Sequence, residues 1–107
     1  MVTRRKRRLG YATVAILRAI EQGHRYGLDI VDATHLASGT VYVALGRLQK
    51  RGLLAATWEK TAIAEAEGRP RRRYYALTAA GWHELRSALE GFEALGLTPA
   101  AETSEAE

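Results

Sequence analysis

The sequence contains no cysteine, which excludes disulfides, thiolate nucleophiles and zinc–thiolate sites. The histidines His24, His35 and His83 lack the spacing of metal ligands, and there is no glycine-rich phosphate loop or nucleophile motif. No run approaches the roughly 18 apolar residues that cross a bilayer, and no small-residue cleavage site follows the basic start. We therefore expect a cytoplasmic protein that is not an enzyme and needs neither a metal nor a cofactor.

The net charge of +4 is unevenly distributed along the chain. Residues 1–75 hold 15 of the 16 Lys and Arg residues but only 6 of the 12 acidic ones. This uneven charge predicts a surface that binds a polyanion on one side of the molecule and a side that does not bind on the other. Basic residues that neutralise phosphates release counterions, which favours such binding. A solvated basic surface is the alternative. The length of 107 residues allows one small core, which a partner chain would help to stabilise.

Hydrophobic spacing predicts three helices in the first half of the chain. Gly27 would let a neighbouring helix approach the second one closely, and Ser38 is the predicted N-cap of the third. Gly52 ends the third helix in the position where a left-handed residue is easily accommodated. The predicted helices cover residues 10–22, 26–33 and 39–51.

The second half of the chain is predicted to form a hairpin and a helix. Strand-like runs at residues 53–60 and 71–77 flank a polar, Gly- and Pro-containing stretch, which indicates a hairpin with a long loop at its tip. Thr78 is the predicted N-cap of the last helix, and a disordered acidic tail is expected at residues 96–107.

The third helix has two chemically different faces. Its apolar face is predicted to pack on the first two helices, through Val41, Leu45 and Leu48. On the other face Arg47 suits a bidentate contact to guanine, Thr40 a phosphate or base edge, and Val43 a thymine methyl group. The alternative is an ordinary surface helix. The preceding basic arm and the following basic hairpin favour DNA binding.

Three segments resemble PadR-like transcriptional regulators. Residues 38–48 (SGTVYVALGRL), followed by GLL, resemble the family's recognition helix. Residues 24–30 (HRYGLDI) resemble its second-helix entry, and residues 68–81 (GRPRRRYYALTAAG) its returning wing strand and next helix. Two positions depart from the family pattern: family members often have a proline where Val43 stands and a long polar or charged side chain where Gly46 stands. The base preference and the rigidity of this helix are therefore expected to differ from those of the family.

The resemblance implies a winged helix-turn-helix homodimer, usually a repressor, whose third helix enters the major groove of double-stranded DNA. It implies DNA contacts at the start of the third helix, at Ser38, Thr40 and Tyr42, and further along it at Arg47 and Lys50. Gly39 and Val43 complete the candidate DNA-binding set on this helix. The fold class is mainly α (α+β), with a two-stranded wing and a C-terminal dimerisation helix. The expected parts are a basic arm (1–8), the DNA-binding domain (9–77), the dimerisation helix (78–95) and the tail (96–107).

Two further basic segments are candidate DNA contacts. In the wing, strand alternation places Arg71 and Arg73 on the face of Leu77, which is expected to meet the core, so Arg72 and Arg69 are the predicted contacts. The arm is expected to follow the minor groove through Arg4, Arg5 and Lys6, the alternative being a solubilising tail.

The last helix carries an apolar seam that predicts a homodimer interface, formed by Trp82, Leu85, Leu89 and Phe92. A two-fold dimer implies an inverted-repeat operator. Short relatives in the family hold flat aromatic effectors between subunits near a seam tryptophan, which makes Trp82 the candidate here; the alternative is that Trp82 only packs the dimer. A winged-helix module that binds protein or RNA without recognising an operator is the alternative function.

Overall fold

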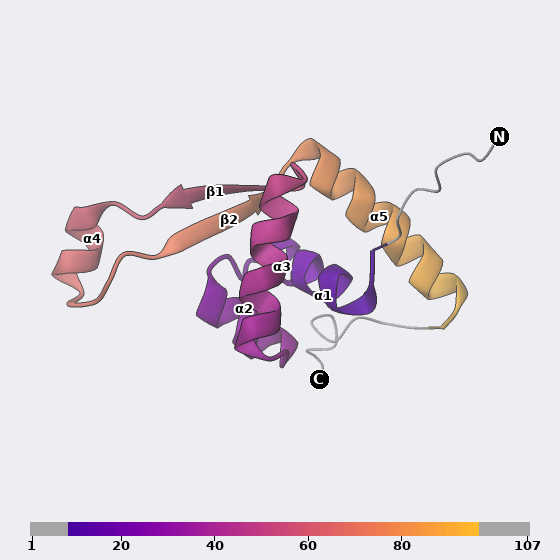
Figure 1. The fold of residues 1–107 in the computed structure, drawn as a ribbon, viewed down its shortest axis with the longest axis horizontal. Helices are drawn as coiled ribbons and strands as arrows, with labels where there is room; N and C mark the ends of the chain where they lie inside the picture. The colour runs from indigo at the N-terminus through magenta and orange to yellow at the C-terminus, as the bar shows by residue number, and fades with distance from the viewer. Residues whose placement is uncertain (1–8, 97–107) are drawn as a thin grey trace.

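The computed structural model describes residues 9–96. The predicted arm, and the tail from residue 97 onward, lie outside these residues. A three-helix body is followed by a hairpin and a last helix (Figure 1). The elements are α1 (Tyr11–Glu21), α2 (Gly27–Thr34), α3 (Ser38–Lys50), β1 (Leu54–Trp58), α4 (Thr61–Ala66), β2 (Arg73–Leu77) and α5 (Ala79–Ala94). The predicted helices and strands are present, with ends shifted by at most a few residues.

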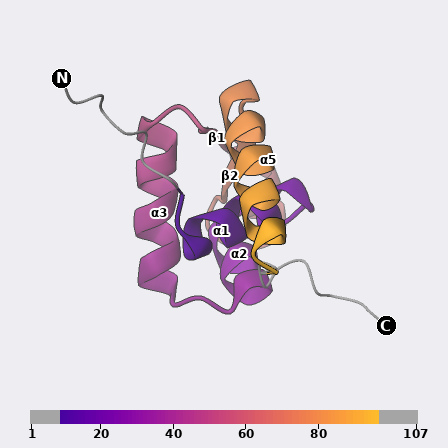
Figure 2. The ribbon, with the colours of Figure 1, turned by 90° about the vertical axis from the view of Figure 1, so that its right-hand side faces the viewer.

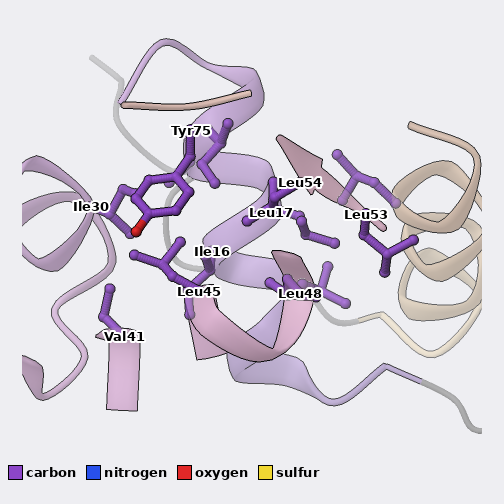
Figure 3. Close-up of a cluster of buried hydrophobic side chains, with 13 residues drawn as sticks. Ile16, Leu17, Ile30, Val41, Leu45, Leu48, Leu53, Leu54 and Tyr75 are labelled. Atoms are coloured by element: carbon purple, nitrogen blue, oxygen red, sulfur yellow. The ribbon is translucent and has the colours of Figure 1, made fainter. Parts of the chain in front are cut away.

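A single apolar cluster holds the body together (Figure 3). Ile16 and Leu17 of α1 are fully buried, as is Ile30 of α2. The apolar face of α3 closes the cluster from one side, and Tyr75 of β2 reaches into it from the sheet. Burying a side chain of this size contributes about 1.5–3 kcal/mol. The cluster therefore fixes α3 by one face and leaves the other face to solvent.

The sheet is a two-stranded antiparallel ribbon, the wing. Its register pairs Leu54 with Leu77 and Trp58 with Arg73. The backbone N–H of Tyr75 also donates to the carbonyl of Arg25 at 2.8 Å, and Tyr26 forms an isolated bridge with Tyr74. The segment before α2 therefore anchors the base of the wing.

The tip of the wing differs from the predicted loop. A short helix, α4, occupies Thr61–Ala66 and is followed by Gly68, whose φ of 67° is left-handed. Alanine-rich sequence of this kind is favourable for helix, but six residues are too few for helical periodicity to be visible. The polar, Gly- and Pro-containing character of the stretch indicates a loop, and only the structure reveals the helix within it.

Helix α5 begins at a junction with the end of α3. The Thr78 hydroxyl accepts from the N–H of Gly81 at 3.0 Å, as predicted for an N-cap, and donates to the carbonyl of Gly52 at 2.6 Å. Gly52 has a φ of 79°, consistent with its predicted place just beyond α3. A side chain at Gly81 would collide with the carbonyl oxygen of Leu53. The junction thus couples the end of α3 to the start of α5.

The prediction that Ser38 caps α3 is wrong. Ala37 occupies the N-cap position without a side-chain hydrogen bond, and Ser38 is the first helical residue. A different device shapes this turn: the Thr34 hydroxyl donates to the carbonyl of Ile30 at 2.8 Å and accepts from the N–H of Leu36 at 3.3 Å. His35 between them adopts the left-handed conformation, with a φ of 61°.

Figure 2 shows how the helices are arranged around α1. Helix α3 lies along one side and α5 along the other, with α1 between them. The wing extends away from this body, as Figure 1 shows.

Candidate nucleic-acid interface

Helix α3 presents a polar outer face on a rigid base. Val41, Leu45 and Leu48 are buried, as predicted for the inner face. Val43 is 56% exposed, and Thr40 and Arg47 beside it are also exposed. Ser38, Gly39 and Lys50 complete this exposed set at the two ends of the helix. Arg47 and Lys50 form no ion pair with any residue in the described range 9–96, so their charges remain available to a ligand.

Tyr42 has a second role besides its exposure. Its ring is 48% exposed and lies against Gly27 at the start of α2, where an added Cβ atom would overlap the ring and its hydroxyl. This is the close approach predicted for Gly27, and the neighbour is a side chain of the third helix. Tyr42 therefore helps to fix the position of α3 relative to α2.

A groove of about 750 Å³ runs between α3 and the start of α1. Arg47 and Arg51 provide positive charge, and Thr13 and Thr40 provide hydroxyl groups. The remaining lining is small or apolar: Leu9, Gly10, Ala12, Gly39, Val43, Ala44 and Leu48. Because Leu9 lies in this groove, the basic arm enters the described structure directly beside α3.

In the wing, Glu59 organises the arginines around its buried carboxylate. The Arg69 guanidinium donates to both carboxylate oxygens, at 2.7 and 2.9 Å. The backbone N–H of Arg72 and the hydroxyl of Tyr74 each donate to the same carboxylate at 3.2 Å. The hydrogen bonds from Arg69 are the main reason that the pKa of Glu59 falls to about 2, and they raise the pKa of Arg69 above its ordinary value.

The other wing arginines lie on aromatic rings. Arg72 stacks 4.0 Å from the centroid of Tyr26, which itself meets Tyr74 edge-on at 5.8 Å. Arg71 and Arg73 lie 5.3 and 5.0 Å from the centroid of Trp58. Cation–π contacts of this kind orient a guanidinium without neutralising its charge.

The two wing arginines predicted to contact DNA, Arg69 and Arg72, both have partners within the protein. Arg69 is paired with Glu59 and, at 2.9 Å, with Glu67. Arg72 keeps its charge but is held against Tyr26. The sequence alone predicts neither the clamp by Glu59 nor the Trp58 ring on which Arg71 and Arg73 lie. The strand pattern contains a signal for the platform, since Trp58 and Arg73 share a face once the register is known.

The predicted seam on α5 is corrected by the structure. Leu85 is only 2% exposed and belongs to the core of its own chain, so it does not form a subunit interface in this conformation. Leu89 and Phe92 are half-buried against the same core, and the Phe92 ring meets Tyr11 of α1 edge-on at 5.7 Å. Trp82 remains 43% exposed. The stripe therefore mainly attaches α5 to α1, a use of helical apolar spacing that looks the same in sequence as a dimer seam.

No group of three or more His, Asp or Glu residues within residues 9–96 could hold a metal ion. His24 instead pairs with Asp29 at 3.1 Å, near the start of α2. Within the same range, no helix is both long and apolar enough to span a membrane.

The family model described as the transcriptional regulator PadR-like family matches residues 16–87. The chain belongs to this family. The match extends from the middle of α1 to the middle of α5 and includes α3 and the wing. PadR-like proteins are transcription regulators and not enzymes, and the fold of this chain is that of a DNA-binding regulator.

Solved structures agree with this assignment. A PadR family transcription regulator from Clostridium difficile superposes with a TM-score of 0.70 at 26% identity, over 81% of this chain and 92% of that one. A PadR-like transcription factor from Bacteroides fragilis gives a TM-score of 0.66 at 25% identity, over 78% and 82%. Bordetella bronchiseptica BpsR, whose DNA binding is regulated by 6-hydroxynicotinic acid, shares the fold. It superposes with a TM-score of 0.65 at 22% identity, over 82% of this chain and 58% of that one. No curated protein matches the chain in sequence.

Proposed function

We propose that this PadR-like protein is a cytoplasmic, homodimeric repressor that recognises an inverted-repeat operator by inserting α3 into the major groove. The observation that carries the proposal is the division of α3 into a buried apolar face and an exposed face whose cations form no ion pair with residues 9–96. A helix held in this way can present side chains to base edges without losing its own packing.

Each outer residue of α3 has a distinct role in this proposal. Arg47 donates to guanine O6 and N7, Val43 contacts a thymine methyl group, and Thr40 bonds a phosphate or base edge. The sugar–phosphate backbone of the DNA is contacted by Ser38, Gly39 and Tyr42 in the first half of the helix and by Lys50 at its end. These roles rest on the exposure of the side chains and on the chemistry of the major groove.

The wing and the arm supply contacts that do not read sequence. Arg71, Arg72 and Arg73 are positioned by aromatic rings and approach phosphates or a narrow minor groove. The side chains of Arg4, Arg5 and Lys6 follow the duplex from their attachment beside α3. Arg69 acts mainly through Glu59, as part of the framework of the wing.

The proposed dimer uses the outer surface of α5, on the opposite side of the body from α3 (Figure 2). Trp82 of α5 is 43% exposed, and Leu95 directly after the helix is 73% exposed. Leu89 and Phe92 on the same helix are only partly buried. A two-fold axis along this surface would present two copies of α3 about 34 Å apart, one turn of DNA.

A planar aromatic effector that relieves repression is part of the proposal. It is supported by the structural neighbour BpsR, whose DNA binding is regulated by 6-hydroxynicotinic acid. Trp82 is the proposed contact, because it is an exposed aromatic side chain on the helix assigned to the dimer. A Trp58→Phe background leaves Trp82 as the sole fluorophore of its kind. A panel of phenolic acids that leaves its emission unchanged would remove the effector from the proposal.

The operator experiment selects genomic fragments with purified protein and then measures affinity by gel shift at two salt concentrations. Replacing both Arg47 and Thr40 with alanine should weaken binding to the selected sequence by about tenfold or more, since a good bidentate contact contributes about 1–3 kcal/mol of discrimination. Lys60→Ala is the matched control, because Lys60 is an exposed cation to which no DNA or subunit contact is assigned. Unchanged recognition by a folded double variant would refute the assignment of α3.

The dimer experiment compares Leu95→Asp with Leu85→Asp by sedimentation and circular dichroism. Leu95→Asp should yield folded monomers, because its side chain makes little contact with its own core. Leu85→Asp should instead disrupt the fold, because it places a charge in that core. A Leu95→Asp, Trp82→Asp variant that keeps the mass of the wild-type dimer would exclude this surface, and a wild-type monomer would exclude the dimer.

A further inference from the structure

The start of α1 and the end of α5 lie at one corner of the molecule. The edge-on contact between Tyr11 and Phe92, with centroids 5.7 Å apart, holds the first turn of α1 against the last turns of α5. Gly96, the last described residue, follows Phe92 by one helical turn. The chain therefore leaves the described structure close to the point where the basic arm enters it.

The basic groove lies between the start of α1 and α3, next to that corner. Figure 2 shows α3 and α5 on the two sides of α1, and Leu9, Gly10, Ala12 and Thr13 line the groove from the α1 side. Arg47 of α3 and Arg51 directly after it line the other side, and neither forms an ion pair with a residue of the described range. The groove is thus a cationic surface to which residues 9–96 supply no counter-charge.

The sequence after Gly96 has the complementary charge. Residues 97–107 contain three glutamates, Glu102, Glu105 and Glu107, and no lysine or arginine. Eleven residues span up to about 36 Å when extended. The end of α5 contacts Tyr11, and Leu9 and Gly10 directly before Tyr11 line the groove, so the segment has to pass about one helix diameter, 10–12 Å. The segment is therefore long enough to reach the groove from its own attachment point.

We propose that residues 97–107 dock on the groove between α1 and α3 through their carboxylates and thereby weaken DNA binding. The inference rests on the proposed function, because the residues covered include Thr40, Val43 and Arg47. The segment acts as an electrostatic competitor of the phosphate backbone for the same cations. Individual exposed ion pairs are weak, but tethering supplies an effective concentration in the millimolar range for flexible linkers.

The competition has a defined consequence for affinity. Docking stabilises the free protein, so every duplex that requires the segment to leave the groove binds more weakly by the same factor. Non-specific duplex binds mainly through phosphates, whereas an operator also gains base contacts that the segment does not imitate. The acidic segment therefore lowers both affinities and leaves their ratio unchanged.

Docking is tested without DNA by paramagnetic NMR. Since the chain has no cysteine, Ser104→Cys provides one unique site for a nitroxide label. The label should broaden the amide signals of residues 40–51 more than those of α4, and 0.5 M salt should reduce the difference, because it screens exposed ion pairs. Broadening that is absent, or equal at α3 and α4, would overturn the proposal.

The effect on DNA is tested with a charge-neutral tail, the triple variant Glu102→Gln, Glu105→Gln, Glu107→Gln. Its affinity for non-specific duplex at low salt should rise about threefold to tenfold, as expected when a tethered competitor is removed. The charge-matched control is Asp32→Asn, Glu90→Gln, Glu93→Gln, at exposed helix positions, and should change affinity much less. Equal increases would indicate a general effect of net charge and contradict docking. If no variant bound any duplex, the proposed function would fail while the NMR result still decided the docking.

Discussion

The outer face of α3 and the wing are both basic, but their charges are held in different ways. Arg47 and Lys50 extend from α3 without an ion pair to any described residue. In the wing, Arg69 is neutralised by Glu59, and Arg71, Arg72 and Arg73 lie on aromatic rings. A helix on a packed core is already rigid, whereas an isolated two-stranded ribbon is only marginally stable. The wing therefore uses part of its charge to order itself.

The difference indicates which residues can read sequence. Reading a base requires a hydrogen-bond donor that the fold holds in position and that forms no bond within the protein. Arg47 meets this requirement among the described residues. Phosphate contacts tolerate a guanidinium held against a ring, since only its exposed edge has to donate. The number of arginines in a segment is thus a poor guide to its part in recognition.

The largest expected effect comes from the inner face of α3. Leu45 is fully buried, so Leu45→Ala should lower the free energy of unfolding by about 2–5 kcal/mol. Val43→Ala is the control on the outer face and should stay within about 0.5 kcal/mol. Urea denaturation measures both. Similar losses in the two variants would contradict the division of α3 into a packed and a free face.

The next effect is expected at Glu59. Glu59→Gln removes the charge that orders Arg69, so the wing should loosen, although the loss of stability should be smaller than for Leu45→Ala because Glu59 lies outside the hydrophobic core. Since the pKa of Glu59 falls from 4.5 to about 2 on folding, its ionised form stabilises the folded state above pH 4.5. This contribution is lost as the pH falls from 4.5 towards 2. Thermal denaturation should show wild type and variant converging with falling pH; a constant difference would argue against the ion pair.

A smaller effect is expected from the ring beneath Arg72. Tyr26→Leu removes the cation–π contact at 4.0 Å and the edge-on contact with Tyr74. The two contacts together should contribute about 1–2 kcal/mol. Tyr26→Phe is the control, because it keeps both rings in place and removes only the hydroxyl. Denaturation curves that coincide for the leucine and phenylalanine variants would show that the ring does not order the wing.

The smallest effect is expected at Trp58, which is 54% exposed. Trp58→Leu removes the surface on which Arg71 and Arg73 rest, so stability should change by less than about 1 kcal/mol. Binding to operator and to unrelated duplex should weaken by the same factor, because these arginines are assigned to phosphates. A loss confined to the operator, measured by gel shift, would instead assign the wing a part in base readout.

Local sequence determined most of the secondary structure and the two faces of α3. The spacing of Val41, Leu45 and Leu48 shows which face is buried, and Thr78 and Gly52 mark helix ends, because these signals act within a few residues. The resemblance of residues 24–30, 38–48 and 68–81 to PadR-like regulators indicates the family, which the match to residues 16–87 confirms.

Only the tertiary structure decided which partner each side chain meets. A stripe containing Leu85 suits a dimer seam or an intramolecular contact equally well, and the position of α1 made it part of the core. Arg69 and Glu59 are ten residues apart, and their pairing depends on how the wing folds back around its tip. Periodicity specifies the direction of a side chain relative to its own element, but burial and ion pairing depend on segments distant in sequence that the fold brings alongside it.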